Sequence, residues 1–297
     1  MLEFQHVSKT FKNQEVLHDI NMEIHDCEFV VLIGPSGCGK TTSLKMINRL
    51  IAPSKGQILL NGSDIRNEDV IRLRRNMGYV IQQTGLFPHM NIEDNMEVIA
   101  KLEHVEQAQR RARTRELMEM VGLDYAEFSQ RYPQELSGGQ QQRVGVARAF
   151  ALDPDIILMD EPFSALDAHL REQMQMQVLE LLESYGKDAV LVTHSRDEAY
   201  RLCGELLVMD AGRPIAHGGT KELFRSPGLV QVARLTGCKN ISRAKKAGAH
   251  RVEALNWGIS LDTADPVPED VSHVGVRAHS FFPPSGASAP NLIAIED

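Results

Sequence analysis

Hydrophobic and polar positions alternate at the start of the chain and merge into continuous apolar runs further on. Leu2, Phe4 and His6 alternate with polar neighbours, and a second alternating stretch covers residues 16–24. Alternation with a period of two predicts strands that bury one face. Four later runs are almost wholly apolar: FVVLIG (29–34), DIILMDEP (155–162), AVLVTH (189–194) and ELLVMD (205–210). Such runs are typical of strands buried on both faces of a parallel sheet.

The segments between these runs have helical composition. Residues 92–122 are rich in Glu, Arg, Met, Leu and Ala, residues 167–184 are strongly helical, and TTSLKMINRLI (41–51) follows a glycine-rich turn. The segment GQILLNG (56–62) predicts a hairpin strand closed by an Asn-Gly turn. Strands that alternate with helices predict an α/β fold with a mainly parallel sheet.

The pattern changes near residues 227–237. RVEALNWGISL (251–261) and VSHVGVRAHSF (271–281) alternate with a period of two, which predicts half-buried antiparallel strands. FFPPSGASAPN (281–291) is rich in Pro, Ser and Ala, and we expect it to fray. We therefore expect one domain over residues 1–235 and a small β-rich appendage over residues 236–297, with Trp257 in its core.

Composition and charge limit the classes of protein to which the chain can belong. Hydrophobic residues make up 42% and charged residues 24%, as in ordinary globular domains. The net charge of −8 does not favour a nucleic-acid-binding surface. Four scattered cysteines form no C-x-x-C pair, which argues against a zinc ribbon or a redox motif. No signal-peptide core and no apolar run of about 18 residues is present, so we expect the chain not to span a membrane by itself.

The stretch GPSGCGKTT fits the pattern G-x-x-x-x-G-K-[ST], between an apolar strand and a helix. Glycines let consecutive backbone N–H groups turn toward one anion, and the helix N-terminus adds partial positive charge. In such a loop the lysine reaches the β- and γ-phosphates and the following hydroxyl binds Mg²⁺. The predicted ATP-binding residues are Gly34, Pro35, Ser36, Gly37, Cys38, Gly39, Lys40, Thr41 and Thr42.

Two further apolar runs end in side chains suited to the hydrolysis of ATP. Asp160 ends IILMD and is predicted to hold Mg²⁺, and Glu161 follows as a base for the attacking water. His194 ends AVLVTH at the sheet edge where α/β proteins gather their ligands, so we predict that it contacts the γ-phosphate.

A second glycine-rich stretch, LSGGQQQR (136–143), opens another predicted helix. Ser137 can cap this helix, and Gly138 and Gly139 expose backbone amides, so this loop is also suited to bind an anion. Because the first loop already surrounds the phosphates, a second copy of the chain, turned head to tail, can supply this one. Two-fold symmetry would then create two equivalent ATP sites.

Together these residues resemble the ATP-binding cassette (ABC) family over residues 1–235. The resemblance implies a P-loop NTPase fold of ABC type, with an antiparallel β subdomain and a helical subdomain over about residues 84–150. It places an adenine-stacking aromatic at Phe11 and a glutamine that senses Mg²⁺ and the attacking water at Gln82, with Gln83 as the alternative. The resemblance implies that LSGGQ, which includes Gln140, is the signature motif. It also implies that SALD (164–167), with Asp167, is a loop at the shared nucleotide and that His194 is the switch histidine.

The resemblance also implies partners. It implies an active head-to-tail homodimer at the cytoplasmic face of the membrane, integral membrane permease subunits, and an extracytoplasmic solute-binding protein. TGLFPHMNIEDNM (84–96), with Phe87, Pro88 and Met90, is the segment expected to receive a permease helix.

The transported solute has two candidates. Residues 40–163 resemble the ATPases of quaternary-amine (glycine betaine, carnitine or choline) importers, and the later residues resemble those of molybdate-type importers. We favour quaternary amines, because the permease-facing segment should decide the choice of partner. A soluble ABC ATPase clamp is the alternative of a different class, although the interval from Gly39 to Leu136 carries no heptad run.

Overall fold

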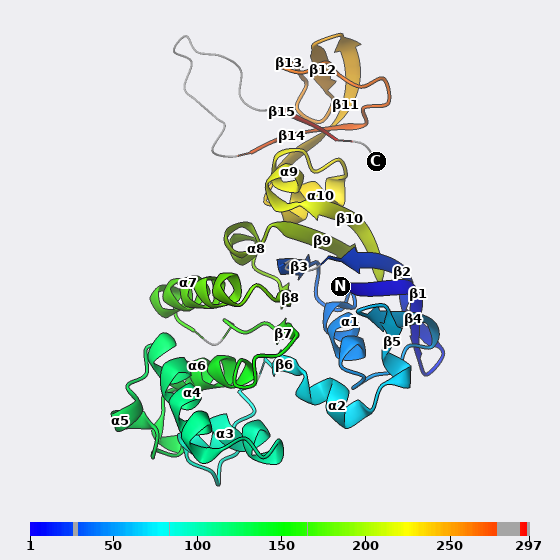
Figure 1. Cartoon of the computed structure of the whole chain (residues 1–297). Coiled ribbons are helices and arrows are strands. Elements are labelled where there is room, and N and C mark those ends of the chain that lie inside the picture. Colours follow the sequence, from blue (N-terminus) through cyan, green and yellow to red (C-terminus); the bar gives the residue numbers. More distant parts are fainter. Residues whose placement is uncertain (26–28, 83, 165, 278–291, 296–297) are drawn as a thin grey trace.

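The computed structural model describes residues 1–25, 29–82, 84–164, 166–277 and 292–295. In this part of the chain the central sheet has the strand order β10-β9-β3-β8-β7-β6 (Figure 1). Only β10 is antiparallel to its neighbour. The strands are β3 (Phe29–Ile33), β6 (Met77–Val80), β7 (Ile156–Asp160), β8 (Asp188–Thr193), β9 (Glu205–Asp210) and β10 (Arg213–Gly219). The mainly parallel sheet expected from the apolar runs is confirmed.

Helices cover both faces of this sheet. Figure 1 shows α1 (Lys40–Ile47) and α2 (Val70–Arg75) on one side, and α7 (Ala168–Tyr185) and α8 (Arg196–Leu202) on the other. Along β7, Ile156 and Leu158 pack in one core cluster, whereas Ile157 and Met159 pack in the other. Both faces are therefore buried, which explains why the strand sequences are apolar without alternation.

A second, antiparallel sheet has the order β2-β1-β4-β5 within the described residues. It consists of β1 (Leu2–Phe11), β2 (Gln14–Ile24), β4 (Lys55–Leu60) and β5 (Ser63–Asp64). The predicted Asn-Gly turn is present, with φ of 51° at Asn61 and 80° at Gly62.

The prediction that His6 continues the buried face of the first strand is wrong. His6 is exposed with φ of 52°, and the register with β2 shifts between Phe4 and Val7. This β-bulge inserts one extra residue, so Val7 takes the buried position instead.

Helices α3 (Ile92–Leu102), α4 (Gln107–Met120), α5 (Tyr125–Phe128) and α6 (Gly138–Ala149) form the helical subdomain. It attaches to the sheet through α6, which packs against β6. Gln142 Nε2 donates to Pro162 O at 2.6 Å, and Arg148 donates to the carbonyls of Thr84 and Gly85.

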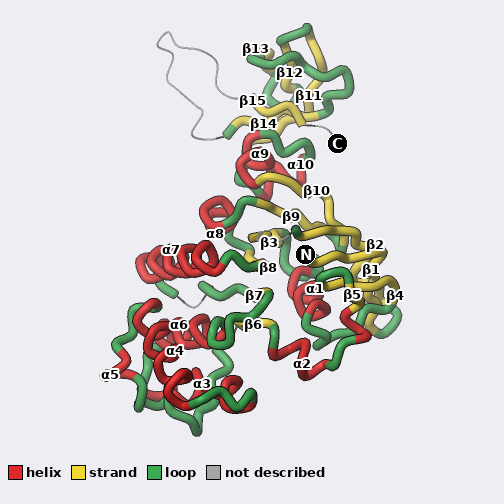
Figure 2. Tube along the Cα trace, viewed as in Figure 1, coloured by secondary structure: helices red, strands yellow, loops and turns green. Residues whose placement is uncertain are grey.

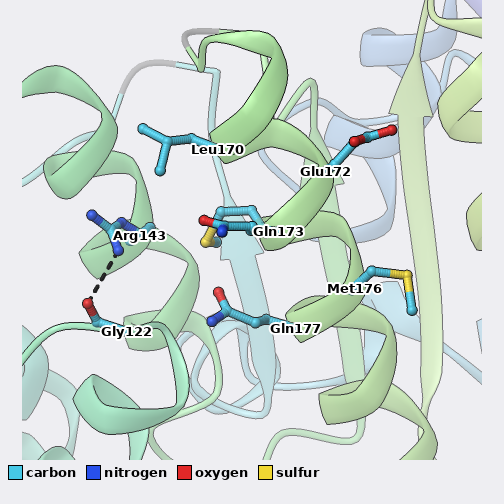
Figure 3. A pocket seen from close by; sticks show the side chains of 8 residues that line it. Gly122, Arg143, Leu170, Glu172, Gln173, Met176 and Gln177 are labelled. Carbon is cyan, nitrogen blue, oxygen red and sulfur yellow. Dashed lines mark hydrogen bonds between the residues drawn. The ribbon is translucent and has the colours of Figure 1, made fainter.

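On its other side the helical subdomain is separated from α7 by a pocket of about 540 Å³. Figure 3 shows Arg143 facing Gln173 and Gln177 of α7 across this space, and Arg143 Nη1 donates to Gly122 O at 3.1 Å. None of the predicted nucleotide-binding residues lines the pocket. The helical subdomain is thus joined to the sheet edge through α6, and the pocket separates part of it from α7.

The C-terminal residues form a third sheet. Figure 2 shows the short helices α9 (Thr220–Arg225) and α10 (Val230–Leu235) between the central sheet and this one. In the described residues its order is β13-β12-β11-β14-β15. Its strands are β11 (Asn240–Gly248), β12 (Arg251–Ala254), β13 (Ile259–Asp262), β14 (His273–Val276) and β15 (Leu292–Ile295). Outside this sheet, short 3₁₀ helices cover Ile65–Asn67 and Pro133–Glu135.

One of the two alternating segments in this region contains a turn. RVEALNWGISL is a hairpin and not one strand, because the chain turns at Gly258 with φ of 63°. Trp257, in that turn, packs partly buried against the core of the appendage, as expected. The segment FFPPSGASAPN, which we expect to fray, lies outside the described residues.

Candidate nucleotide site

The glycine-rich loop immediately precedes the N-terminus of α1. Gly39 is its N-cap, with φ of 106° and no side-chain capping bond. A Cβ at this position would lie 2.1 Å from Leu17 Cδ2, so only glycine fits. The first amides of α1 consequently have no side-chain acceptor at the N-cap and are suited to bind an anion. Thr41 and Thr42 are half-buried in its first turn, and Pro35, Ser36 and Gly37 are exposed at the rim.

Lys40 is only 7% exposed and lies inside the loop. Its Nζ donates to Gly34 O at 2.8 Å and to Pro35 O at 2.9 Å, and lies 3.8 Å from Cys38 Sγ. Burial raises the pKa of the Cys38 thiol, and the nearby ammonium partly opposes that shift. The loop therefore holds its cation where phosphate oxygens are expected to bind.

Thr41 and Asp160 form the candidate magnesium site. Thr41 Oγ1 donates to Asp160 Oδ1 at 2.9 Å, although 119 residues separate them. Asp160 is 5% exposed. Its pKa is raised, chiefly by burial, while the Thr41 hydrogen bond and the Lys45 charge act in the opposite direction. A hydroxyl and a carboxylate are the hard oxygen ligands that Mg²⁺ prefers.

Three side chains from the ends of three neighbouring strands meet beside this pair. Glu161 Oε2 accepts a hydrogen bond from Gln82 Nε2 at 3.1 Å, and Glu161 Oε1 lies 3.3 Å from His194 Nδ1. The His194 side chain is 65% exposed and that of Glu161 is 22% exposed, so both can reach a bound substrate. Glu161 has φ of 49°, in the left-handed region, and such strain is concentrated at functional sites. Gln83, the alternative to Gln82, lies outside the described residues.

Phe11 ends β1 and is 41% exposed. Lys9 Nζ lies 4.8 Å from the ring centroid. The exposed residue is available for stacking, and the adenine contact stays a prediction.

The LSGGQ motif caps α6 in the helical subdomain. Ser137 N–H donates to Gln140 Oε1 at 2.8 Å, and Gln140 N–H donates to Ser137 Oγ at 3.3 Å. This capping box uses two of the four N-terminal amides of the helix, and leaves those of Gly138 and Gly139 without an intrahelical acceptor. Helix α6 packs against β6, α3 and α4, whereas α1 packs against β7 and β8. The two glycine-rich loops therefore belong to different parts of the subunit.

Asp167 serves a structural role within the subunit. Its Oδ1 accepts hydrogen bonds from the N–H groups of His169 and Leu170, which caps α7. Any contact of Asp167 with nucleotide stays a prediction. Ala165, in the same predicted loop, lies outside the described residues.

Sequence reasoning missed three residues that support this site. Thr193 and Glu198 connect the end of β8 to α8 by a hydrogen bond, and Arg171 of α7 donates to two carbonyls of the loop that follows β7. The only signal in the sequence was a glutamate four residues after His194, which is not distinctive in a helix.

Known proteins resemble this chain in sequence and in fold. A family model described as ABC transporter matches residues 17–164. The choline transport ATP-binding protein OpuBA of Bacillus subtilis is 43% identical over 86% of this chain and 67% of its own length. The osmoprotectant import ATP-binding protein OsmV of Salmonella typhimurium is 47% identical over 78% of this chain and 61% of its own length.

Among solved structures, an ATP-binding cassette in a dimeric post-hydrolysis state with ADP and Pi is similar. It has a TM-score of 0.69 and 32% identity, over 74% of this chain and 99% of that one. The fold and the site together define an ATP-hydrolysing protein of the P-loop class. The chain belongs to the ABC transporter family, as an ATP-binding subunit. In the described residues, no helix is both long and apolar enough to cross a membrane.

Proposed function

We propose that this subunit powers an importer of quaternary-amine osmoprotectants such as choline, carnitine or glycine betaine. The observation that carries the catalytic part is the placement of Glu161 between Gln82 and His194, next to the Thr41–Asp160 pair. The relatives named for choline and osmoprotectant transport support the choice of solute over molybdate.

The hydrolysis of ATP follows from this placement. Lys40 and the amides of α1 hold the phosphates, and His194 contacts the γ-phosphate. Gln82 and Glu161 orient the attacking water, and Glu161 accepts its proton as the bond from the γ-phosphorus to the bridging oxygen breaks. Thr41, Asp160 and Gln82 would hold Mg²⁺, which neutralises charge on the phosphate oxygens.

The second glycine-rich loop completes the site from another subunit. In a head-to-tail homodimer, the free amides of Gly138 and Gly139 and the Ser137 hydroxyl would cover the γ-phosphate bound by the partner. The placement of α6 away from α1 supports this arrangement, as does the dimeric state of the similar cassette.

A groove beside the helical subdomain suits the permease. It has a volume of about 340 Å³ and lies between β6, α3 and the end of α6. Phe87 and Leu102, which line it, are 41% and 52% exposed, so an apolar partner helix would bury them. The subunit would then lie at the cytoplasmic face of the membrane, with an extracytoplasmic binding protein selecting the solute. We propose that residues 1–235 form the cassette, with a helical subdomain over about 84–150, and that residues 236–297 form the appendage.

Uptake by the complete importer tests the solute. The subunit would be reconstituted in vesicles with its permease and binding protein, and uptake of labelled choline, glycine betaine and molybdate compared. We expect ATP-dependent uptake of a quaternary amine only. Molybdate uptake would instead support the alternative solute, and ATP hydrolysis without uptake of any of the three would count against the assignment to osmoprotectant import.

Replacement of Lys40 tests the phosphate contact. We expect Lys40→Ala to weaken nucleotide binding by about 10- to 100-fold, because a charge-assisted hydrogen bond contributes about 1.5–3 kcal/mol. Binding of a fluorescent ATP analogue measures the effect, and Lys55→Ala, which removes an exposed lysine from β4, is the matched control. Unchanged affinity in Lys40→Ala would show that the ammonium does not bind phosphate.

A further inference from the structure

A buried carboxylate stabilises the turn that carries His194. Glu198, on α8, is 5% exposed, and its Oε2 accepts a hydrogen bond from Thr193 Oγ1 at 2.5 Å. Thr193 ends β8 and directly precedes His194. The bond therefore connects α8 to the residue from which the imidazole emerges.

Two further hydrogen bonds close this turn. Ser195 N–H donates to Thr193 Oγ1 at 3.0 Å, and Glu198 N–H donates to Ser195 Oγ at 3.3 Å. Thr193 Oγ1 thus accepts one bond and donates another, and Glu198 takes part through both its backbone and its carboxylate. Glu198 is therefore hydrogen-bonded to the residues on both sides of His194.

The second carboxylate oxygen faces a guanidinium on α7. Arg171 Nε lies 4.0 Å from Glu198 Oε1. The same guanidinium donates to Leu166 O at 2.8 Å and to Phe163 O at 3.3 Å. Both carbonyls belong to buried residues that precede α7. The guanidinium thus donates to two carbonyls while its charge faces the carboxylate of Glu198.

The loop that contains these carbonyls is hydrogen-bonded to Glu161, the proposed catalytic base. Ser164 Oγ donates to Glu161 O at 2.9 Å, and Asp167 caps the same helix that carries Arg171. A continuous path of hydrogen bonds and one ion pair therefore runs from the residues before α7, through Arg171 and Glu198, to the turn of His194. Burial raises the pKa of Glu198, while the Thr193 hydrogen bond and the Arg171 charge oppose that shift, as expected for interactions that stabilise the charged form.

We propose that Glu198 and Arg171 are positioning residues, which couple the orientation of His194 to the segment that contains Ser164 and Asp167. The inference rests on the proposed function, because this segment is expected to reach the shared nucleotide only in the head-to-tail dimer. Approach of the second subunit would shift the backbone before α7, and the Arg171–Glu198 pair would transmit that shift to His194. Neither residue touches ATP in this scheme.

Steady-state kinetics of the full-length chain test the pair. We expect Glu198→Gln and Arg171→Gln each to lower kcat about tenfold, a loss typical of residues that act through a coupled network. The KM for ATP should change less than about twofold, because the contacts of the phosphate loop are untouched. The double variant should lose little more than either single one, since the two residues act as a unit. Arg171→Lys should recover part of kcat, because its ammonium keeps the charge near Glu198 but cannot serve both carbonyls.

A second ion pair between the same helices is a matched control. Arg201 Nη1 of α8 contacts Glu172 Oε1 of α7, and both side chains are more than half exposed. Glu172→Gln and Arg201→Gln should leave kcat unchanged. This comparison separates the positioning of His194 from a general loosening of α7 against α8.

The outcomes distinguish this inference from the proposed function. Each variant is also combined with Glu161→Gln, and ATP-dependent dimers are measured by size-exclusion chromatography. If folded Glu198→Gln and Arg171→Gln retain wild-type kcat, or if KM rises while kcat is kept, the inference is wrong. If the Glu161→Gln protein itself forms no ATP-dependent dimer, the proposed head-to-tail function is wrong instead. Should either glutamine variant fail to fold, the kcat and KM of Arg171→Lys decide by the same criteria.

Discussion

Glu161→Gln is expected to lower kcat about 1,000-fold while ATP-bound dimers accumulate. A general base contributes on the order of 10²- to 10⁴-fold to a reaction, and glutamine cannot accept the proton of the attacking water. The variant keeps the size of the side chain and can still accept the Gln82 hydrogen bond that the structure shows. Binding of ATP should therefore remain, and only its cleavage should be lost.

Phosphate release and size-exclusion chromatography with ATP measure the two halves of this prediction. Glu172→Gln, an exposed glutamate on α7, is the control for loss of one negative charge. Hydrolysis by Glu161→Gln at the wild-type rate would show that another group takes the proton.

The second large effect is expected at Gly138, in LSGGQ. A Cβ built at this position meets no atom within 4 Å, so the isolated subunit has room for a side chain. Gly138 is also the first residue of α6, where a carboxylate interacts favourably with the helix dipole. Gly138→Asp should therefore fold normally and bind ATP through its own phosphate loop. The added charge would nevertheless repel the γ-phosphate of the partner, and we expect kcat to fall about 100-fold.

Gln107→Asp is the matched control, since it adds the same charge to the exposed first position of α4. Mixing gives a sharper test of the shared site. A dimer of one Gly138→Asp subunit and one Lys40→Ala subunit contains one intact site, made from the phosphate loop of the first and the LSGGQ loop of the second. Mixing the two impaired proteins should therefore restore part of the hydrolysis. A Gly138→Asp subunit that hydrolyses ATP as fast as the wild type would contradict the head-to-tail arrangement.

Much of the fold could be predicted because the sequence patterns that indicate it each lie within a short segment of the chain. The strands of the central sheet are short apolar runs, and the phosphate loop requires glycine at positions such as Gly39 for steric reasons that involve few neighbours. The capping box of Ser137 and Gln140 spans only four residues. The His6 bulge was missed because the residues themselves alternate correctly, and the register depends on the pairing of β1 with β2.

The amino-acid sequence thus determined the sheet type, the two glycine-rich loops at helix N-termini and the residue types that we propose for hydrolysis, because each depends on the conformation of a short segment. Only the tertiary structure decided which of these groups meet. The Thr41–Asp160 contact and the approach of Gln82 to Glu161 join segments 119 and 79 residues apart. The order of the strands in the sheet creates such contacts, and no local pattern of hydrophobic and polar residues encodes them. The same holds for Arg171 and Glu198, whose partners are backbone carbonyls and a hydroxyl that only packing of α7 and α8 brings within reach.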